Sequence, residues 1–257
     1  MNALAYIGHS TLDFCASCGK YVIFLYNTIL HGVRPPYYWK QIFTQLRDVG
    51  FYSLPVIGLT AFFTGAVLAL QSYTGFSRFS AESALPMLVV LCITRELGPV
   101  IAGLMFAGRV GATMAAEIGT MKVTEQIDAL STLSTCCYRY LYLPRILAGL
   151  VTLPILVFIF DIIGVLGGFL VSVFQLDFNA SQYIKMTEQF VQAEDVISGL
   201  VKSAFFGIST ALTGCFKGAT SSGGSAGVGR ATMNAVVMSS ITILLLNYIL
   251  TTIIFSK

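Results

Sequence analysis

The chain has 257 residues, of which 56% are hydrophobic and only 11% are charged, with a formal net charge of +3. Soluble domains are about a quarter charged, whereas this chain has a mean hydropathy of +0.80. The composition therefore excludes an ordinary soluble domain, gives no reason to expect a nucleic-acid partner, and indicates an integral membrane protein.

Residues 1–50 alternate short apolar runs with polar and charged residues, and no run is long enough to cross a bilayer. An amphipathic helix in the plane of the membrane interface fits this pattern better than a loosely attached tail, although both remain open. Trp39, beside two tyrosines, is typical of an interfacial aromatic anchor. A cleavable signal peptide is not expected, because residues 1–19 contain Asp13 and neither Lys nor Arg.

Five apolar windows predict five transmembrane helices, since about 20 apolar residues cross a hydrocarbon core of ~30 Å. The windows are 51–70, 83–108, 146–176, 196–216 and 231–256. We therefore predict an all-α integral membrane protein. It is a single domain, residues 1–257, in which the interfacial segment, residues 1–50, precedes a five-span region, residues 51–257.

The second window shows no clear stop before Gly119. Counted from Ala84, one straight helix would be roughly 54 Å long, which exceeds the bilayer. The pair Gly98-Pro99 predicts a break, because proline cannot donate to the carbonyl of Arg95 and clashes with it. Beyond it, small residues recur every four positions and predict a ridge that lets another helix approach closely. The ridge consists of Gly103, Ala107, Gly111, Ala115 and Gly119.

The distribution of Lys and Arg predicts the orientation of the chain. With a cytoplasmic N-terminus, the inner segments hold Lys20, Arg34, Lys40, Arg47, Arg109, Lys122, Arg139, Arg145, Lys217 and Arg230, against Arg78, Lys185 and Lys257 outside. We therefore expect a cytoplasmic N-terminus and a periplasmic C-terminus.

No catalytic, metal or cofactor site is expected. The pair Cys15 and Cys18 has no second ligand pair, which makes a zinc site improbable. Residues 224–229 have the glycine spacing of a phosphate-binding loop, but Arg230 follows where the motif needs lysine. We interpret the whole connection KGATSSGGSAGVGRATMN, residues 217–234, as a flexible glycine-serine turn that enters the fifth span.

Polar residues reappear between the second and third spans, at residues 112–133. Thr124 is a candidate N-cap for a short amphipathic helix, with Glu125 and Asp128 in its first turn and Ile127 on its apolar face. The alternative is a solvated connecting loop. Either would lie on the cytoplasmic side.

Arg95 and Glu96 interrupt an otherwise apolar span. Each costs about 2.5–3.5 kcal/mol at mid-bilayer on insertion scales, so such residues normally face the protein interior or a water-filled cavity. Adjacent helix residues point about 100° apart, so the two need different partners. We expect Glu96 to pair with Lys202, and Arg95 with Asp161 or with a lipid headgroup.

The alternative is that these charges only neutralise one another, with Lys202 extending outward. The adjacent Gly-Pro pair favours a polar or water-lined setting for Arg95 and Glu96. Such a spot suits an amphiphile, with its head near the charges. Its tails would lie against Leu68, Leu70, Phe76 and Phe79.

The run RELGPVIAGLMFAGRVGATMAAEIGTMKVTEQIDAL, residues 95–130, resembles the signature region of the MlaE (YrbE) family. These proteins are permease subunits of MCE-associated ABC transporters that move phospholipid between bacterial membranes. The resemblance continues in LVKSAFF around Lys202, in SAGVGRAT at residues 225–232, and in total length.

The resemblance implies a homodimer in the bacterial inner membrane. It also implies an MlaF-like ATPase with an MlaB-like STAS protein on the cytoplasmic side, and an MlaD-like ring of MCE domains on the periplasmic side. Residues of about 124–133 would form the coupling helix. Candidate ATPase contacts are Glu117, Glu125, Gln126 and Asp128.

An outward cavity of the dimer would hold phospholipid near Arg95 and Glu96. Its expected lining adds Leu68, Leu70, Tyr73, Phe76, Phe79, Lys202 and Asn247. Two positions depart from the family pattern, since Asn247 stands where an acidic residue is usual and Asp161 where an apolar one is. A relocated negative charge would keep the balance of charge in the cavity.

The sequence thus favours a non-enzymatic phospholipid permease that is driven by a separate ATPase subunit. An ion-coupled secondary carrier of an amphiphilic substrate would use the same buried charges, although no inverted repeat supports it. An intramembrane lipid enzyme would use Glu96 as acid or base, but it lacks a nucleophile or metal set.

Overall fold

A computed structural model describes residues 3–32, 35, 37–79 and 84–255, without the side chains of residues 3–10, 13, 14 and 79. Arg34 and Lys257, which entered the orientation argument, and the side chain of Phe79 therefore lie outside the described part. The main α-helices are α1 (Ala3–Gly32), α2 (Trp39–Phe51), α3 (Leu54–Phe76), α4 (Leu85–Cys92), α5 (Gly98–Phe106), α6 (Ala112–Val123), α7 (Gln126–Thr132), α8 (Leu143–Phe174), α9 (Ala180–Phe190), α10 (Ala193–Ala219) and α11 (Gly224–Phe255).

Three π-helical segments interrupt or precede these helices: η3 (Ile93–Leu97), η4 (Ala107–Gly111) and η5 (Tyr138–Tyr142). A short 3₁₀ turn, η1 (Ser77–Phe79), follows α3. Every regular element of the described residues is helical, which confirms the predicted all-α class.

Five helical stretches of the described chain are long and apolar enough to cross a membrane. They are Trp39–Phe76, Leu85–Val123, Tyr138–Phe174, Ala193–Ala219 and Gly224–Phe255. The five predicted spans are therefore confirmed, although the first begins at Trp39, well before the predicted boundary. The cause is local, because the turn between α2 and α3 is only two residues long and Ser53 donates its hydroxyl back to the carbonyl of Val49.

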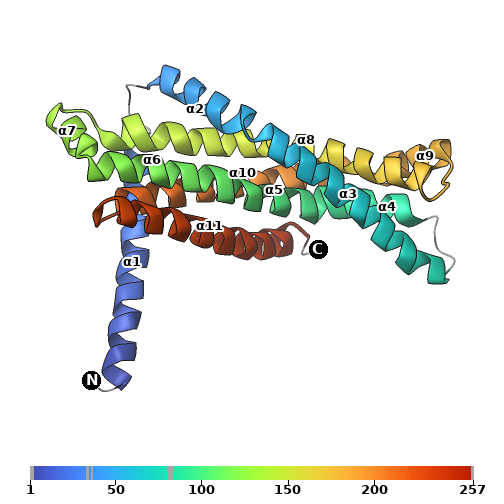
Figure 1. Cartoon of the computed structure of the whole chain (residues 1–257), viewed down its shortest axis with the longest axis horizontal. Coiled ribbons are helices and arrows are strands. Elements are labelled where there is room, and N and C mark those ends of the chain that lie inside the picture. The colour runs from blue at the N-terminus through green and yellow to red at the C-terminus, as the bar shows by residue number, and fades with distance from the viewer. Residues whose placement is uncertain (1–2, 33–34, 36, 80–83, 256–257) are drawn as a thin grey trace.

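The N-terminal segment is largely one 30-residue helix, α1, that leaves the bundle at a steep angle (Figure 1). Its C-terminal half is held by aromatic contacts, with the Phe24 ring centroid 4.9 Å from that of Tyr142 and 5.7 Å from that of Phe216. Tyr21 forms a 3.0 Å hydrogen bond with Thr213, and burial raises the pKa of its hydroxyl. A helix steeply inclined to the spans can lie in the plane of the membrane interface. The interfacial position of α1 stays a prediction.

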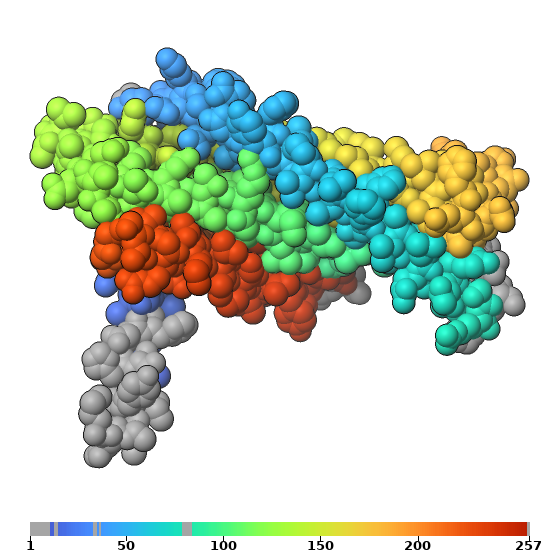
Figure 2. Space-filling model, viewed as in Figure 1, coloured from blue at the N-terminus to red at the C-terminus, as the bar shows by residue number. Residues whose placement is uncertain are grey.

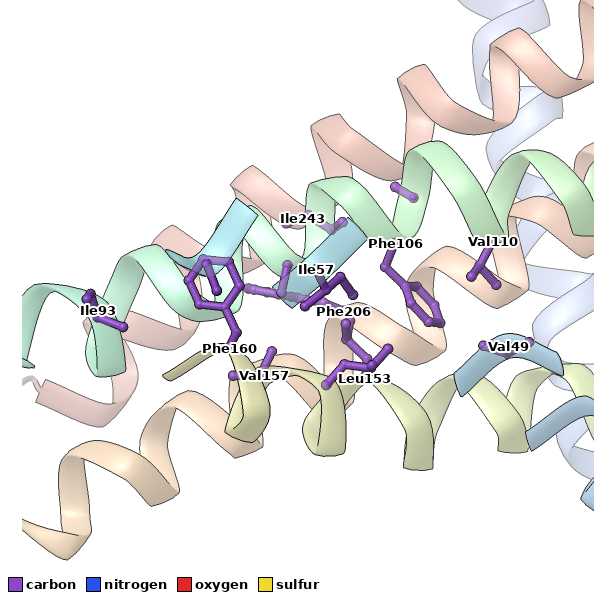
Figure 3. Close-up of a cluster of buried hydrophobic side chains, with 14 of the residues drawn as sticks. Val49, Ile57, Ile93, Phe106, Val110, Leu153, Val157, Phe160, Phe206 and Ile243 are labelled. Atoms are coloured by element: carbon purple, nitrogen blue, oxygen red, sulfur yellow. The ribbon is translucent and has the colours of Figure 1, made fainter. Parts of the chain in front are cut away.

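Apolar side chains from α3, η3, α5, α8, α10 and α11 meet between the spans (Figure 3). Phe106, Leu153, Phe160 and Phe206 are fully buried there. Because lipid tails are as apolar as these side chains, close packing rather than transfer from water holds spans together. The core therefore depends on shape more than on hydrophobicity.

The predicted ridge of small residues is confirmed as a packing surface. A Cβ built on Gly103 would lie 3.3 Å from Phe206 of α10, and one on Gly111 would lie 3.1 Å from Thr210 of the same helix. One on Gly119 would meet Val228 of α11 at 3.2 Å. The second span therefore packs along both of the last two spans.

The predicted glycine-serine turn before the fifth span is shorter than expected. Within this connection, Gly223 and Gly224 have positive φ, at 89° and 67°, and α11 already begins at Gly224. Residues 225–232 are therefore helical, and the prediction of a flexible turn there was wrong.

Candidate functional site

The second span is continuous through Gly98-Pro99, so the predicted break was wrong. The chain widens into the π-helical segment η3 immediately before the proline. Pro99 deprives the Arg95 carbonyl of its usual donor, and the Lys202 ammonium supplies a replacement at 2.9 Å. A π-bulge of this kind accommodates a proline without ending the helix, and such bulges are frequent at functional sites.

Glu96 accepts three hydrogen bonds from two other spans. Lys202 Nζ lies 2.8 Å from its Oε1, Asn247 Nδ2 lies 2.9 Å from its Oε2, and Thr251 Oγ1 lies 3.2 Å from its Oε1. Lys202 has no exposed side-chain surface, whereas 40% of the Glu96 side chain is exposed. The predicted Glu96–Lys202 pair is confirmed, and an outward-pointing Lys202 is excluded.

Arg95 pairs with Asp195, whose Oδ1 lies 3.2 Å from its Nε. The guanidinium also lies 3.9 Å from the ring centroid of Phe255, within cation–π range. The predicted pairing of Arg95 with Asp161 was wrong, because the structure places Asp195 there. Asp195 lies two helical turns before Lys202, so both face the same side of α10, a spacing that could have revealed it.

The resulting charge cluster is Arg95, Glu96, Asp195 and Lys202. Two cations and two anions make it electrically balanced, which allows ionised groups to persist among apolar spans. Arg95 remains 35% exposed, and Asn247 Oδ1 receives no hydrogen bond from the described residues. The cluster thus offers a partly exposed cation and a partly exposed anion to a polar group that approaches from outside.

The residues expected to contact lipid tails all belong to the end of α3 or the turn after it. Leu68 and Phe76 pack against the hydrophobic core, and Leu70 is 39% exposed. The ring of Tyr73 lies 6.1 Å from that of Phe178, beyond the end of α8. Their role in a lipid cavity stays a prediction.

A short helix, α7, lies at the end of the molecule opposite α9 (Figure 1). Its presence within residues 124–133 was predicted, but Thr124 does not cap it. Thr124 ends α6 and donates its hydroxyl to the Thr120 carbonyl. Glu125 precedes α7 instead, in the left-handed region with φ of 58°.

Two of the four candidate ATPase contacts are engaged within the chain. Glu117 Oε2 accepts a 2.8 Å bond from the buried Arg145, and Lys122 donates to Asp128 at 3.0 Å. Glu125 and Gln126 are exposed. Glu117 and Asp128 are exposed too, so Glu125 and Gln126 differ from them in taking part in neither of these ion pairs.

Five spans, three of which meet at a balanced charge cluster, and a short exposed helix at one end define a multi-pass membrane protein with a polar site between its helices. The comparisons with known proteins give the family. The family model described as "Permease MlaE" matches residues 42–253, and the chain belongs to the MlaE permease family.

Relatives cover nearly the whole chain. A "Probable ABC transporter permease protein" of Rickettsia bellii is 56% identical over 99% of this chain and 98% of its own. The "Intermembrane phospholipid transport system permease protein MlaE" of Haemophilus influenzae is 34% identical over the same shares. The chloroplastic protein TRIGALACTOSYLDIACYLGLYCEROL 1 of Arabidopsis thaliana is 32% identical over 89% of this chain and 65% of its own.

Proposed function

We propose that this chain is the transmembrane permease subunit of an ABC transporter that moves phospholipid between the inner and outer membranes of a bacterium. The observation that carries the proposal is the partly exposed charge cluster at Arg95 and Glu96. A zwitterionic or anionic headgroup finds both a cation and hydrogen-bonding partners there. The names of the Rickettsia and Haemophilus relatives support the transporter class and the cargo.

A homodimer through α11 would enclose this cluster. The apolar window of α11 is only 11% buried, less than that of any other span in the described chain, and the helix lies open along one face (Figure 2). Asn247, Thr251 and Phe255, which contact the cluster, belong to the C-terminal half of α11. A second copy on that face would turn the cluster into the wall of a shared cavity.

The end of the molecule that carries α7 suits the cytoplasmic side. Lys122, Arg139, Arg145, Lys217 and Arg230 all lie at or near this end of their helices, as the positive-inside rule requires. An MlaF-like ATPase, paired with an MlaB-like STAS protein, would dock on α7. An MlaD-like ring of MCE domains would meet the opposite, periplasmic end, and we expect the C-terminus on that side of the membrane.

Transport would then follow from movement of packed helices. α7 is joined to α6, and α6 continues through η4 and α5 to η3 and the charge cluster. ATP binding and hydrolysis on the partner would shift this span against α10 and α11, and the two copies would expel phospholipid from the cavity. In this scheme the chain itself catalyses no reaction.

The first test is purification of the complex from its native membrane, with identification of co-purifying chains and bound lipid. Glu96→Ala alone would leave the buried Lys202 ammonium unpaired, so E96Q and K202M are combined. We expect an ATPase chain to co-purify with wild type and with the E96Q/K202M double variant. The amount of bound phospholipid should be several-fold lower in the double variant than in wild type. Unchanged lipid occupancy in the double variant would show that the charge cluster does not bind the lipid. Absence of a co-purifying ATPase would favour the ion-coupled secondary carrier.

The second test concerns the contact through α7. We expect Glu125→Lys to weaken ATPase binding and to uncouple hydrolysis from lipid transport, because it reverses a charge on the exposed docking surface. Glu125→Gly is the matched control, since it removes the charge but suits the left-handed backbone. The measurements, made in reconstituted vesicles, are the number of ATPase chains bound per permease and the amount of lipid transported per ATP hydrolysed. Equal coupling in all three proteins would exclude Glu125 from the contact.

A further inference from the structure

The two cations of the charge cluster lie close to one aromatic ring. The Arg95 guanidinium carbon lies 3.9 Å from the ring centroid of Phe255, and the Lys202 ammonium nitrogen lies 5.8 Å from it. Both distances are within the ~6 Å at which the electron-rich face of an aromatic ring attracts a cation. Because Phe255 is the last residue of α11, its ring joins the C-terminal end of that helix to the cluster.

Phe255 belongs to a face of α11 that is directed at the cluster. Asn247, Thr251 and Phe255 follow one another at four-residue spacing, which places them on one side of a helix. Asn247 and Thr251 donate hydrogen bonds to Glu96, whereas Phe255 contacts the cations. This helix face therefore interacts with both signs of charge, and its aromatic member interacts with the positive one.

Arg95 has few other contacts that fix its orientation. Its ion pair with Asp195 uses Nε, at 3.2 Å from Oδ1, and its side chain is 35% exposed. Neither of its Nη groups forms a hydrogen bond with the described residues. A long side chain held at one atom keeps rotamer freedom that it must lose when it binds a ligand. The ring of Phe255 restricts that freedom before a ligand arrives.

An aromatic ring over a guanidinium leaves the hydrogen-bond donors of that group free. The ring interacts with the flat face of the guanidinium, whereas the N–H groups point outward in its plane. Since Nε of Arg95 points at Asp195, the two Nη groups form the free edge. Their N–H bonds match two oxygens of one phosphate group. Phe255 thus orients the donors of Arg95 without using any of them.

We propose that Phe255 is a positioning residue of the lipid site, whose ring holds the Arg95 guanidinium so that its two Nη groups face the lipid phosphate. This inference rests on the proposed function, because it concerns how the same cluster binds its cargo. Such preorganisation raises affinity by lowering the conformational entropy that is lost on binding. An aliphatic side chain of similar size would fill the space without attracting the cation.

The test changes the charge distribution of the ring and leaves its shape almost unchanged. Phe255 is replaced by phenylalanine analogues with one, two or three fluorine atoms, which weaken the attraction of the ring face for a cation step by step. Binding of phosphatidylglycerol to the purified, delipidated complex is measured for each protein. We expect each fluorine to weaken binding by a similar factor, to about fivefold with three fluorine atoms and about fivefold in Phe255→Leu.

Two controls separate the possible failures. The same analogues at Phe174, which is 77% exposed and has no cation over its ring among the described residues, should leave binding unchanged. Equal losses at both positions would overturn the role of Phe255. A loss of affinity in E96Q/K202M, together with equal affinity for all analogues at Phe255, would support the proposed function and overturn only this inference. Unchanged affinity in E96Q/K202M would contradict the proposed function, and the role of Phe255 with it.

Discussion

Gly65→Ala is expected to destabilise the folded chain by about 3 kcal/mol, at the upper end of the usual cost of overpacking. A Cβ on Gly65 would overlap the backbone carbonyl oxygen of Gly164, and one on Gly167 would overlap that of Phe62 to a smaller extent. The backbones of α3 and α8 are thus in direct contact. Neither can move away without opening the core between them.

Gly75→Ala is the matched control on the same helix, because no atom outside its own helix segment lies within 4 Å of the added methyl group. Its stability should stay within about 1 kcal/mol of wild type and rise if anything, since alanine is the better helix former. Gly58→Ala, whose methyl group would lie 3.4 Å from Ile163, should fall between the two. Thermal midpoints in detergent give the comparison, and equal midpoints for Gly65→Ala and Gly75→Ala would contradict the close contact.

The five spans follow from the sequence because the bilayer imposes a length and a polarity that few segments satisfy. The Glu96–Lys202 pair follows for a related reason, since charges within the spans are scarce and must find each other. The ridge from Gly103 to Gly119 can also be predicted from the sequence, because a four-residue period keeps small side chains on one face of a helix. In each case a local pattern carries the information.

The errors arise where the outcome depends on a distant contact or on a backbone conformation that residue types alone do not reveal. Pro99 would end an isolated helix, but Lys202, more than a hundred residues later, satisfies the freed carbonyl of Arg95. Asp195 lies one residue before the predicted fourth window, residues 196–216, although it occupies the first turn of α10. Thr124 is a good N-cap by type, yet the left-handed Glu125 sets the corner between α6 and α7. Of these cases, only Asp195 has a local signal, its spacing of two helical turns from Lys202.

Lys202→Met is expected to destabilise the protein by about 3–5 kcal/mol, the usual cost of breaking a buried ion pair by removing one partner. It leaves the carbonyl of Arg95 without a donor and Glu96 with only Asn247 and Thr251. Glu96→Gln should cost a similar amount for the converse reason, because the Lys202 ammonium has no exposed surface. Each variant is measured by reversible unfolding in detergent.

The double variant E96Q/K202M should be more stable than the sum of the single changes predicts, by about 2–3 kcal/mol. Removing both charges leaves no unpaired ion, and the net charge of the cluster stays at zero. Thr251→Val is the matched control, because its 3.2 Å bond to Glu96 is longer and carries no opposite charge, so its cost should be about 1 kcal/mol. Additive losses in the double variant would mean that Glu96 and Lys202 do not interact, and the charge cluster would then need another explanation.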